Sequence, residues 1–176
     1  MKFSRKWAMP NADTFTVPPI HDFVTKWLDG KESTVDPFAR DSKLCKYTND
    51  INPEASAEYC MDALDFLRWV ADADIKADLV ILDPPYSPRQ VSECYKEIGL
   101  PVGISDTQNG ALCRKMRDIA SEIISPRGIV LSFGWNTVGM GKKRGYEIEE
   151  IMLVCHGGVH NDTICMAERS KPMLFT

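Results

Sequence analysis

The stretch Asp78-Leu79-Val80-Ile81-Leu82-Asp83-Pro84-Pro85-Tyr86 decides the fold of this chain. Residues 79–82 are all apolar, and a polar turn follows at once. An apolar run without alternation is typical of a central parallel strand that is covered on both faces. Two consecutive prolines fix φ and prevent the turn from becoming helix. The sequence therefore predicts a buried parallel strand that ends in an Asp-Pro-Pro-Tyr turn.

Around this strand, apolar runs alternate with segments of helical periodicity, a pattern that indicates an α/β sheet. The spacing predicts helices over 20–28, 62–70, 88–98 and 112–124, and Gly30 can end the first of them. Strands are expected over 33–38, 46–51, 78–82, 128–133, 147–155 and 162–168. The last two are separated by a short turn that suits an antiparallel hairpin. We expect a mostly parallel, doubly wound sheet with a C-terminal antiparallel hairpin, and ligands at the carboxyl ends of its strands.

Length and composition fit one ordinary globular domain. The chain has 176 residues, 44% of them hydrophobic and 26% charged, so we expect a single domain over 1–176. No apolar run reaches the ~20 residues that span a bilayer, and the basic N-terminus lacks the apolar core of a secretory signal. We therefore expect a cytoplasmic protein without a membrane contact. The six cysteines form no Cys-x-x-Cys pair, and we expect reduced thiols and no metal site.

The turn after the central strand can carry chemistry. Its prolines leave the carbonyl groups of Asp83 and Pro84 without helical partners, so these oxygens can accept other hydrogen bonds. A site that accepts both N–H bonds of an exocyclic amine pulls the nitrogen towards a tetrahedral shape and frees its lone pair for attack on a methyl sulfonium. Tyr86 offers an aromatic face for a flipped base. The alternative is a strand-end turn with a capping aspartate and a packed tyrosine.

The order of motifs resembles the DNA amino-methyltransferases that modify adenine N6 or cytosine N4. Val35-Asp36-Pro37-Phe38-Ala39 resembles the family's first cofactor motif, and Asn49-Asp50-Ile51-Asn52-Pro53 the second, whose acidic residue binds ribose hydroxyls. Cys60-Met61-Asp62-Ala63-Leu64 resembles the third, which meets the adenine ring. Asp83-Pro84-Pro85-Tyr86 matches the catalytic motif residue for residue. The resemblance implies a Rossmann-like class I methyltransferase fold, S-adenosylmethionine as cofactor and DNA as partner.

The resemblance also implies which residues contact the cofactor. The segment from Trp7 to Thr16 lies where the family closes over the methionine end. The implied cofactor positions are Trp7, Pro10, Thr14, Asp36, Pro37, Phe38, Ala39, Asp50, Ile51, Asp62 and Ala63. The implied catalytic positions are Asp83, Pro84, Pro85 and Tyr86.

The chain departs from the family at two points. Arg40-Asp41-Ser42 stands where the first motif has glycine, and a side chain at residue 40 can point away from the cofactor if its φ stays negative. We also expect no separate target-recognition domain, and two loops at the carboxyl edge, residues 87–110 and 134–145, to replace it. Their candidate substrate residues are Arg89, Trp135, Asn136, Lys142, Lys143 and Arg144.

Several alternatives remain open at this stage. The same chemistry suits RNA or a protein amide, although Asp83, rather than asparagine, favours a base. The missing glycines and the net charge of -4 are compatible with an inactive protein that binds a cofactor or a partner. Dimerisation is common among the resembled enzymes, so a homodimer is one expectation.

Overall fold

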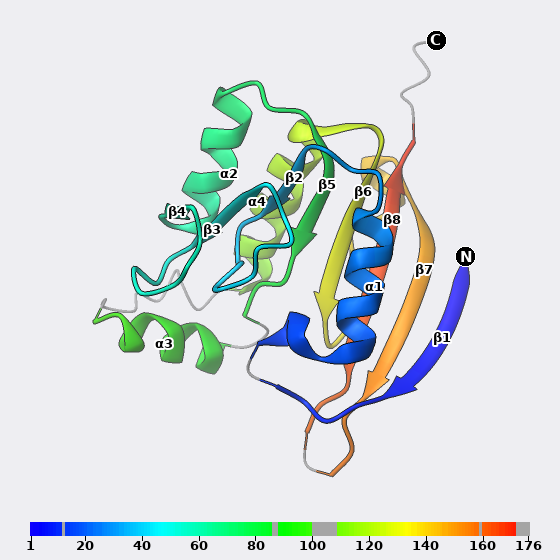
Figure 1. The fold of residues 1–176 in the computed structure, drawn as a ribbon. Coiled ribbons are helices and arrows are strands. Elements are labelled where there is room, and N and C mark those ends of the chain that lie inside the picture. Colours follow the sequence, from blue (N-terminus) through cyan, green and yellow to red (C-terminus); the bar gives the residue numbers. More distant parts are fainter. Residues whose placement is uncertain (12, 86–87, 100–108, 159, 172–176) are drawn as a thin grey trace.

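The computed structural model describes residues 1–11, 13–85, 88–99, 109–158 and 160–171, and Figure 1 shows their arrangement. Within these ranges, eight strands form one sheet in the order β1-β7-β8-β6-β5-β2-β3-β4. Neighbouring strands are parallel except at β8, which runs antiparallel to β6 and β7. The predicted mostly parallel sheet with an antiparallel hairpin is confirmed. The strands are β1 (Lys2–Trp7), β2 (Thr34–Asp36), β3 (Tyr47–Asp50), β4 (Tyr59–Cys60), β5 (Ala77–Leu82), β6 (Ile124–Gly134), β7 (Tyr146–Cys155) and β8 (Thr163–Ser170).

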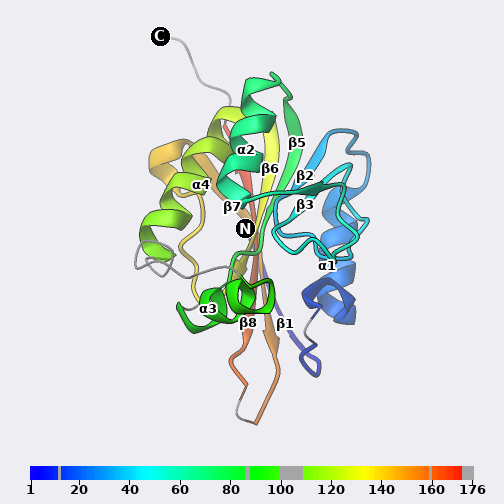
Figure 2. The same cartoon turned by 90° about the vertical axis from the view of Figure 1, so that its left-hand side faces the viewer.

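Helices cover both faces of the sheet, which confirms the doubly wound arrangement. Figure 2 shows the sheet nearly edge-on, with α2 and α4 on one side and α1 on the other. The helices are α1 (Pro18–Leu28), α2 (Ala63–Asp72), α3 (Pro88–Glu97) and α4 (Asn109–Ile123), with short 3₁₀ turns η1 (Thr14–Thr16) and η2 (Lys142–Arg144). The helix predicted over 20–28 is α1, and Gly30 follows its end with a φ of 68°, as a C-terminal glycine does.

The position of β5 between two helical layers explains why its sequence is continuously apolar. Leu79 and Ile81 pack with α1 on one face, whereas Val80 and Leu82 pack with α2 and α4 on the other. Because successive side chains of a strand point to opposite faces, a strand between two helical layers needs apolar residues at every position. All four of these side chains are buried. The same parallel pairing brings the carboxyl ends of β2, β3, β4 and β5 to one edge.

Three strands differ from the sequence prediction, and the shortest of them is β4, for which no strand was predicted. β1 was not predicted, and it pairs in parallel with β7 from Lys2 to Trp7 at the outer edge of the sheet. β6 begins at Ile124, directly after α4, although this strand was expected to begin at residue 128. The register of β6 against β5 shifts between Ile124 and Ile129. Residues 125–128 therefore form an irregularity within the strand, and Arg127 has a φ of 65° there.

The segment between β6 and β7 crosses from one edge of the sheet to the other. Gly134, the last residue of β6, pairs with Ile164 of β8, whereas Tyr146, the first residue of β7, pairs with Ser170. Glu168, a buried residue of β8, accepts hydrogen bonds from the backbone N–H groups of Met140 (2.6 Å) and Gly141 (3.0 Å). A Cβ on Gly139 would collide with Glu168 and Met166. This close approach therefore requires glycine.

The course of the chain between β6 and β7 contradicts one expectation about the predicted substrate residues. Lys142, Lys143 and Arg144 form η2, which precedes β7 and lies at the edge opposite the Asp83 turn. Arg144 pairs there with Asp118 of α4 at 2.6 Å. The expectation that this basic triplet lies at the carboxyl edge is wrong. The reason is that the chain returns to the amino edge through an extended segment before β7 begins.

The described cysteines carry free thiols, and Cys45, Cys155 and Cys165 are buried. Burial raises the pKa of the Cys45 and Cys165 thiols well above the ordinary value. The prediction of reduced thiols in the core is confirmed for these residues. Among the described parts of the chain, no helix combines the length and apolar character needed to cross a membrane, and no three potential metal ligands gather in one place.

Candidate functional site

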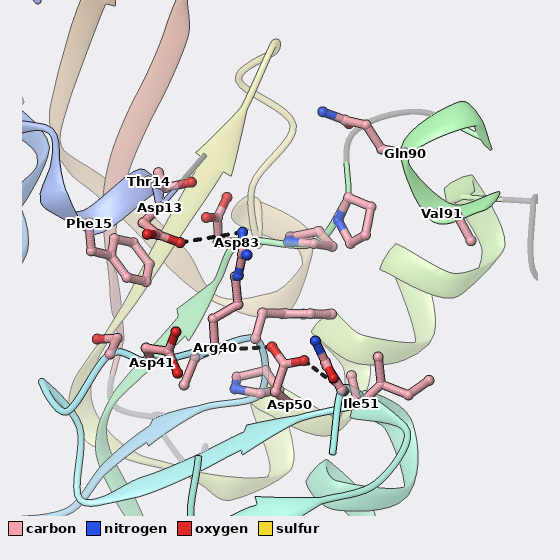
Figure 3. Close-up of a pocket in the computed structure, with 18 of the residues that line it drawn as sticks. Asp13, Thr14, Phe15, Arg40, Asp41, Asp50, Ile51, Asp83, Gln90 and Val91 are labelled. Atoms are coloured by element: carbon pink, nitrogen blue, oxygen red, sulfur yellow. Dashed lines mark hydrogen bonds and ion pairs between the residues drawn. The ribbon is translucent and has the colours of Figure 1, made fainter. Parts of the chain in front are cut away.

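A cavity of about 480 Å³ lies at the carboxyl edge of the sheet, where the segments after β2, β3, β4 and β5 meet. Figure 3 shows its charged centre. Of the predicted cofactor positions, Thr14, Pro37, Phe38, Ala39, Asp50, Ile51, Asp62 and Ala63 line it. The predicted catalytic residues Asp83, Pro84 and Pro85 line the same cavity, whereas Tyr86 lies outside the described residues. The fold thus brings together these four segments and Thr14 of η1, which are far apart in the sequence.

A buried asparagine holds three of these segments in place. The Asn49 amide donates to the carbonyl oxygens of Pro37 (3.2 Å) and Met61 (3.0 Å), and its oxygen accepts from the Met61 N–H (3.1 Å). Asn49 is fully buried, so these hydrogen bonds satisfy polar groups that water cannot reach. We infer that Asn49 sets the spacing of the cavity wall, a role that its sequence motif did not reveal.

The turn after β2 forms the floor of the cavity. Asp36 is buried and accepts a hydrogen bond from the Phe38 N–H at 3.0 Å. The Ala39 N–H donates to the carbonyl of Asn49 at 2.9 Å. Arg40 then adopts a left-handed conformation with a φ of 47°. The condition of a negative φ, under which the side chain at this residue can point away from the cofactor, is therefore not met, and the conformation costs an arginine about 1 kcal/mol relative to the glycine of the resembled motif.

Asp50, the last residue of β3, is held by two backbone groups. Its carboxylate accepts hydrogen bonds from the N–H groups of Arg40 (3.0 Å) and Asn52 (2.8 Å). Each carboxylate oxygen has a second lone pair, so both can still accept a hydroxyl hydrogen from a ligand. The geometry therefore fixes the orientation of Asp50 towards the cavity and leaves its acceptor capacity in part unused.

Asp62 begins α2 and also lines the cavity. One of its oxygens accepts from the Leu64 N–H at 2.8 Å, so Asp62 is the N-cap of α2. The other oxygen accepts from the Tyr95 hydroxyl at 3.4 Å, a contact from α3. Tyr95 lines the cavity as well. Sequence reasoning missed Tyr95, because nothing in its local pattern distinguishes it from other polar positions of α3.

The cavity is strongly acidic. The carboxylates of Asp13, Asp41, Asp50, Asp62 and Asp83 line it, and Arg40 is the one permanently charged cation among its described lining residues. Burial raises the pKa of Asp36 to about 7, and the nearby Asp83 and Asp50 add to this effect, whereas the Phe38 N–H opposes it. Such an environment favours a ligand with a positive charge near the carboxylates.

Three predicted cofactor positions do not line the large cavity: Asp36, which is fully buried beneath it, and Trp7 and Pro10, which lie elsewhere. Trp7 is at the end of β1 with 67% of its surface exposed, and Pro10 lines a second cavity. Neither residue lines the large cavity, because β1 pairs with the far side of β7 and carries its C-terminal end away from β2. The segment predicted to close over the cofactor reaches the cavity only from Asp13 onwards. Sequence reasoning missed its other lining residues, Asp13, Phe15 and Thr16.

The second cavity, of about 290 Å³, shares Thr14 with the large one. It is lined by Pro10, Asn11, Thr14, Val17, Ile20, Trp135, His156, His160, Asn161 and Thr163. Of the predicted substrate residues, Trp135 contributes to this wall. His156 is buried, with one ring nitrogen 2.8 Å from the carbonyl of Ala8 and the other 2.9 Å from the Thr163 hydroxyl. These contacts tie the hairpin of β7 and β8 to the N-terminal segment.

The remaining predicted substrate residues line neither of the two cavities. Asn136 is exposed and its side chain accepts from the Val138 N–H at 2.9 Å, the geometry of a turn residue. Arg89 is exposed on α3, next to Gln90 and Val91, which do line the large cavity. Arg89 therefore precedes wall residues of the large cavity on α3, and Asn136 directly follows Trp135 in the chain.

Known proteins share the fold of this chain. Neither a protein-family model nor a curated protein matches the sequence, but solved structures superpose on it. SMU.776, a methyltransferase complexed with SAH, gives a TM-score of 0.58 at 14% identity over 86% of this chain and 48% of its own. This chain thus spans about half the length of SMU.776.

Two further structures match over nearly their whole length. The N-methyltransferase NodS from Bradyrhizobium japonicum WM9 gives a TM-score of 0.57 at 11% identity, covering 88% of this chain and 96% of its own. The methyltransferase yhhF from Escherichia coli gives 0.56 at 10% identity, covering 93% and 92%. Together with the strand order and the antiparallel β8, these superpositions show that the chain has the Rossmann-like fold of class I methyltransferases.

Proposed function

We propose that this protein transfers a methyl group from S-adenosylmethionine to the exocyclic amine of a DNA base, with adenine N6 as the target. One observation carries the proposal. The Asp83-Pro84-Pro85 turn lines the same cavity as Asp50 and Asp62, at the carboxyl edge of a sheet with a methyltransferase fold. A turn with two acceptor groups beside a cofactor-sized cavity is what amine methylation needs.

The residues of the cavity fit the cofactor. Its volume lies in the range of ligand pockets that hold molecules of drug size. Asp50 has the remaining acceptor capacity to take ribose hydroxyls, and Phe38, Ile51 and Ala63 offer apolar contacts for a purine ring. The excess of carboxylates suits a positively charged sulfonium. When bound, the cofactor supplies a methyl group activated by that charge.

The protein's own contribution is to activate the amine. The Asp83 carboxylate accepts one amino hydrogen and the Pro84 carbonyl accepts the other, so the nitrogen lone pair turns out of conjugation with the ring. Because the turn contains two prolines, its backbone is fixed before the substrate arrives. Positioning of this kind contributes about 7–11 kcal/mol at the limit. The same proposal gives Tyr86 the stacking face for the base.

The smaller cavity is the proposed entry of the base. It shares Thr14 with the large cavity, and Trp135 forms part of its wall with 42% of its surface exposed. An indole face of this kind can stack on a base that has left the duplex, an interaction of about 1–3 kcal/mol. Arg89, next to wall residues of the large cavity on α3, is the proposed phosphate contact. Lys142 and Lys143 have no part in this proposal, since they lie at the opposite edge.

The direct test is mass spectrometry of nucleosides from the DNA of cells that express the protein, beside an Asp83→Ala control. We expect N6-methyladenine only with the intact protein, and a loss in the variant on the order of 10²–10³-fold, as for removal of one preorganised group. Calorimetric titration should show that the variant still binds S-adenosylmethionine. If the DNA carries no new methylated base, the same measurement on RNA nucleosides and on protein amides separates the alternative substrates. If the unaltered protein did not bind S-adenosylmethionine, it would share only its fold with methyltransferases.

A further inference from the structure

Arg40 holds an unusual position in the cavity. Its φ of 47° is a conformation that an arginine adopts at a cost. Its backbone is nevertheless fixed, because the Arg40 N–H donates to Asp50 at 3.0 Å and the Ser42 N–H donates to the carbonyl of Ala39 at 2.8 Å. The turn thus fixes the Cα–Cβ direction of residue 40, from which the side chain extends.

That direction leads across the cavity. Figure 3 shows the Arg40 side chain crossing towards Asp13 and Asp83. One of its terminal nitrogens lies 3.3 Å from a carboxylate oxygen of Asp13, and both side chains are about half exposed. Asp13 stands at the start of η1, on the side of the cavity that faces the Asp83 turn. A guanidinium and a carboxylate therefore lie side by side in the wall of the cavity.

The charges around this pair limit what can bind there. Every other permanently charged side chain among the described lining residues is a carboxylate. A ligand that carries its own carboxylate would be repelled by that wall unless it met Arg40. An arginine can hold a carboxylate through two parallel N–H bonds, and the Asp13 carboxylate can accept from an ammonium group.

We propose that Arg40 and Asp13 together recognise a free α-amino acid group, with the carboxylate on Arg40 and the ammonium on Asp13. This inference rests on the proposed function, since S-adenosylmethionine ends in such a group. Arg40 would thus replace, with a side chain, contacts that a glycine turn makes through its backbone. The strained conformation is retained because it brings the guanidinium to the amino acid end.

The test compares two ligands that differ only at that end. S-adenosylhomocysteine carries the amino acid group, whereas 5′-methylthioadenosine has the same nucleoside and sulfur without it. Calorimetric titration of Arg40→Gly should show a loss of S-adenosylhomocysteine affinity on the order of 10- to 100-fold, as for a charged hydrogen-bonded contact. The affinity for 5′-methylthioadenosine should stay within about 2-fold. Asp13→Asn should show the same selectivity, because it also removes a charge that only the amino acid end meets.

Arg127 provides a matched control. It is also an arginine at positive φ (65°), but it lies in β6 and does not line the cavity. Arg127→Gly should leave both affinities unchanged, and neither glycine variant should lower the melting temperature, since glycine adopts both conformations without strain.

Each remaining outcome counts against the inference in a different way. Equal losses for both ligands in Arg40→Gly would mean that Arg40 supports the turn and does not recognise the amino acid group. Tighter binding of S-adenosylhomocysteine would mean that the Arg40–Asp13 pair closes the cavity instead. If neither ligand bound the unaltered protein, the proposed function itself would fail, and the inference with it.

Discussion

The buried carboxyl group of Asp36 makes the stability of this protein depend on pH. Its side chain is fully buried, and one oxygen accepts from the Phe38 N–H at 3.0 Å. Among the described residues, the other oxygen has no hydrogen-bond partner. Burial raises the pKa of Asp36 from 3.8 to about 7. The substitution Asp36→Asn removes this titration and keeps the shape of the side chain.

The sign follows from the raised pKa. Between pH 4 and pH 7 the unfolded chain loses the Asp36 proton whereas the folded protein keeps it, so the free energy of unfolding falls as the pH rises. Each pH unit in that window corresponds to about 1.4 kcal/mol. Over the whole window the contribution is about 4 kcal/mol. Between pH 4 and pH 8, the free energy of unfolding of Asp36→Asn should therefore rise by about 4 kcal/mol relative to that of the unaltered protein.

We also expect a difference in the free energy of unfolding between the two proteins that does not depend on pH. The amide group introduced by Asp36→Asn would place an N–H group where the structure describes no acceptor, at a cost of about 1–3 kcal/mol. Denaturant unfolding of both proteins at pH 4, 5, 6, 7 and 8 separates this offset from the slope. A constant difference between the two proteins across this range would refute the reasoning.

Asp41, an exposed aspartate that lines the large cavity, serves as the control. The hydrogen bond from the backbone N–H of Ser56 lowers the pKa of Asp41. Its contribution to stability is therefore present above the unfolded pKa and is lost as the pH falls. Asp41→Asn should change the pH dependence in the opposite direction to Asp36→Asn, and only at acidic pH.

Three further predictions concern the crossing segment, the basic triplet and the ribose contact. Glu168→Ala leaves two buried backbone N–H groups without their acceptor and should lower the free energy of unfolding by about 3–5 kcal/mol, measured by denaturant titration. The double variant Lys142→Ala, Lys143→Ala should change DNA affinity by less than about 3-fold in a fluorescence anisotropy titration, because η2 is remote from the cavity; a larger loss would place DNA on that edge. Asp50→Asn should weaken S-adenosylmethionine binding by about 10-fold in calorimetry, since the amide keeps one acceptor in place of two.

The sequence by itself determined the layout of the candidate site. An unbroken apolar strand followed by Asp83-Pro84-Pro85 fixed the centre of the sheet, because only a strand covered on both faces has this pattern. Asp50 ends the predicted strand β3, whereas Asp62 was found only through the resemblance of its motif, because the strand before it, β4, was not predicted. Three short motifs and one strand therefore predicted part of the cavity lining, although Asp36 of the first motif does not contribute to it.

Tertiary structure alone decided features that depend on distant partners. The edge strand β1 exists because β7 offers it a partner, and its own sequence carries no strong apolar pattern. The place of Lys142 and Lys143 was set by Glu168, which holds the crossing segment against the sheet from a distant position in the chain. The direction of Arg40 depends on a backbone hydrogen bond to Asp50. Local periodicity in the sequence indicates which face of a helix or strand is buried. The strand pairings and hydrogen bonds named above instead depend on contacts between residues far apart in the chain. Such contacts form only once the sheet is assembled.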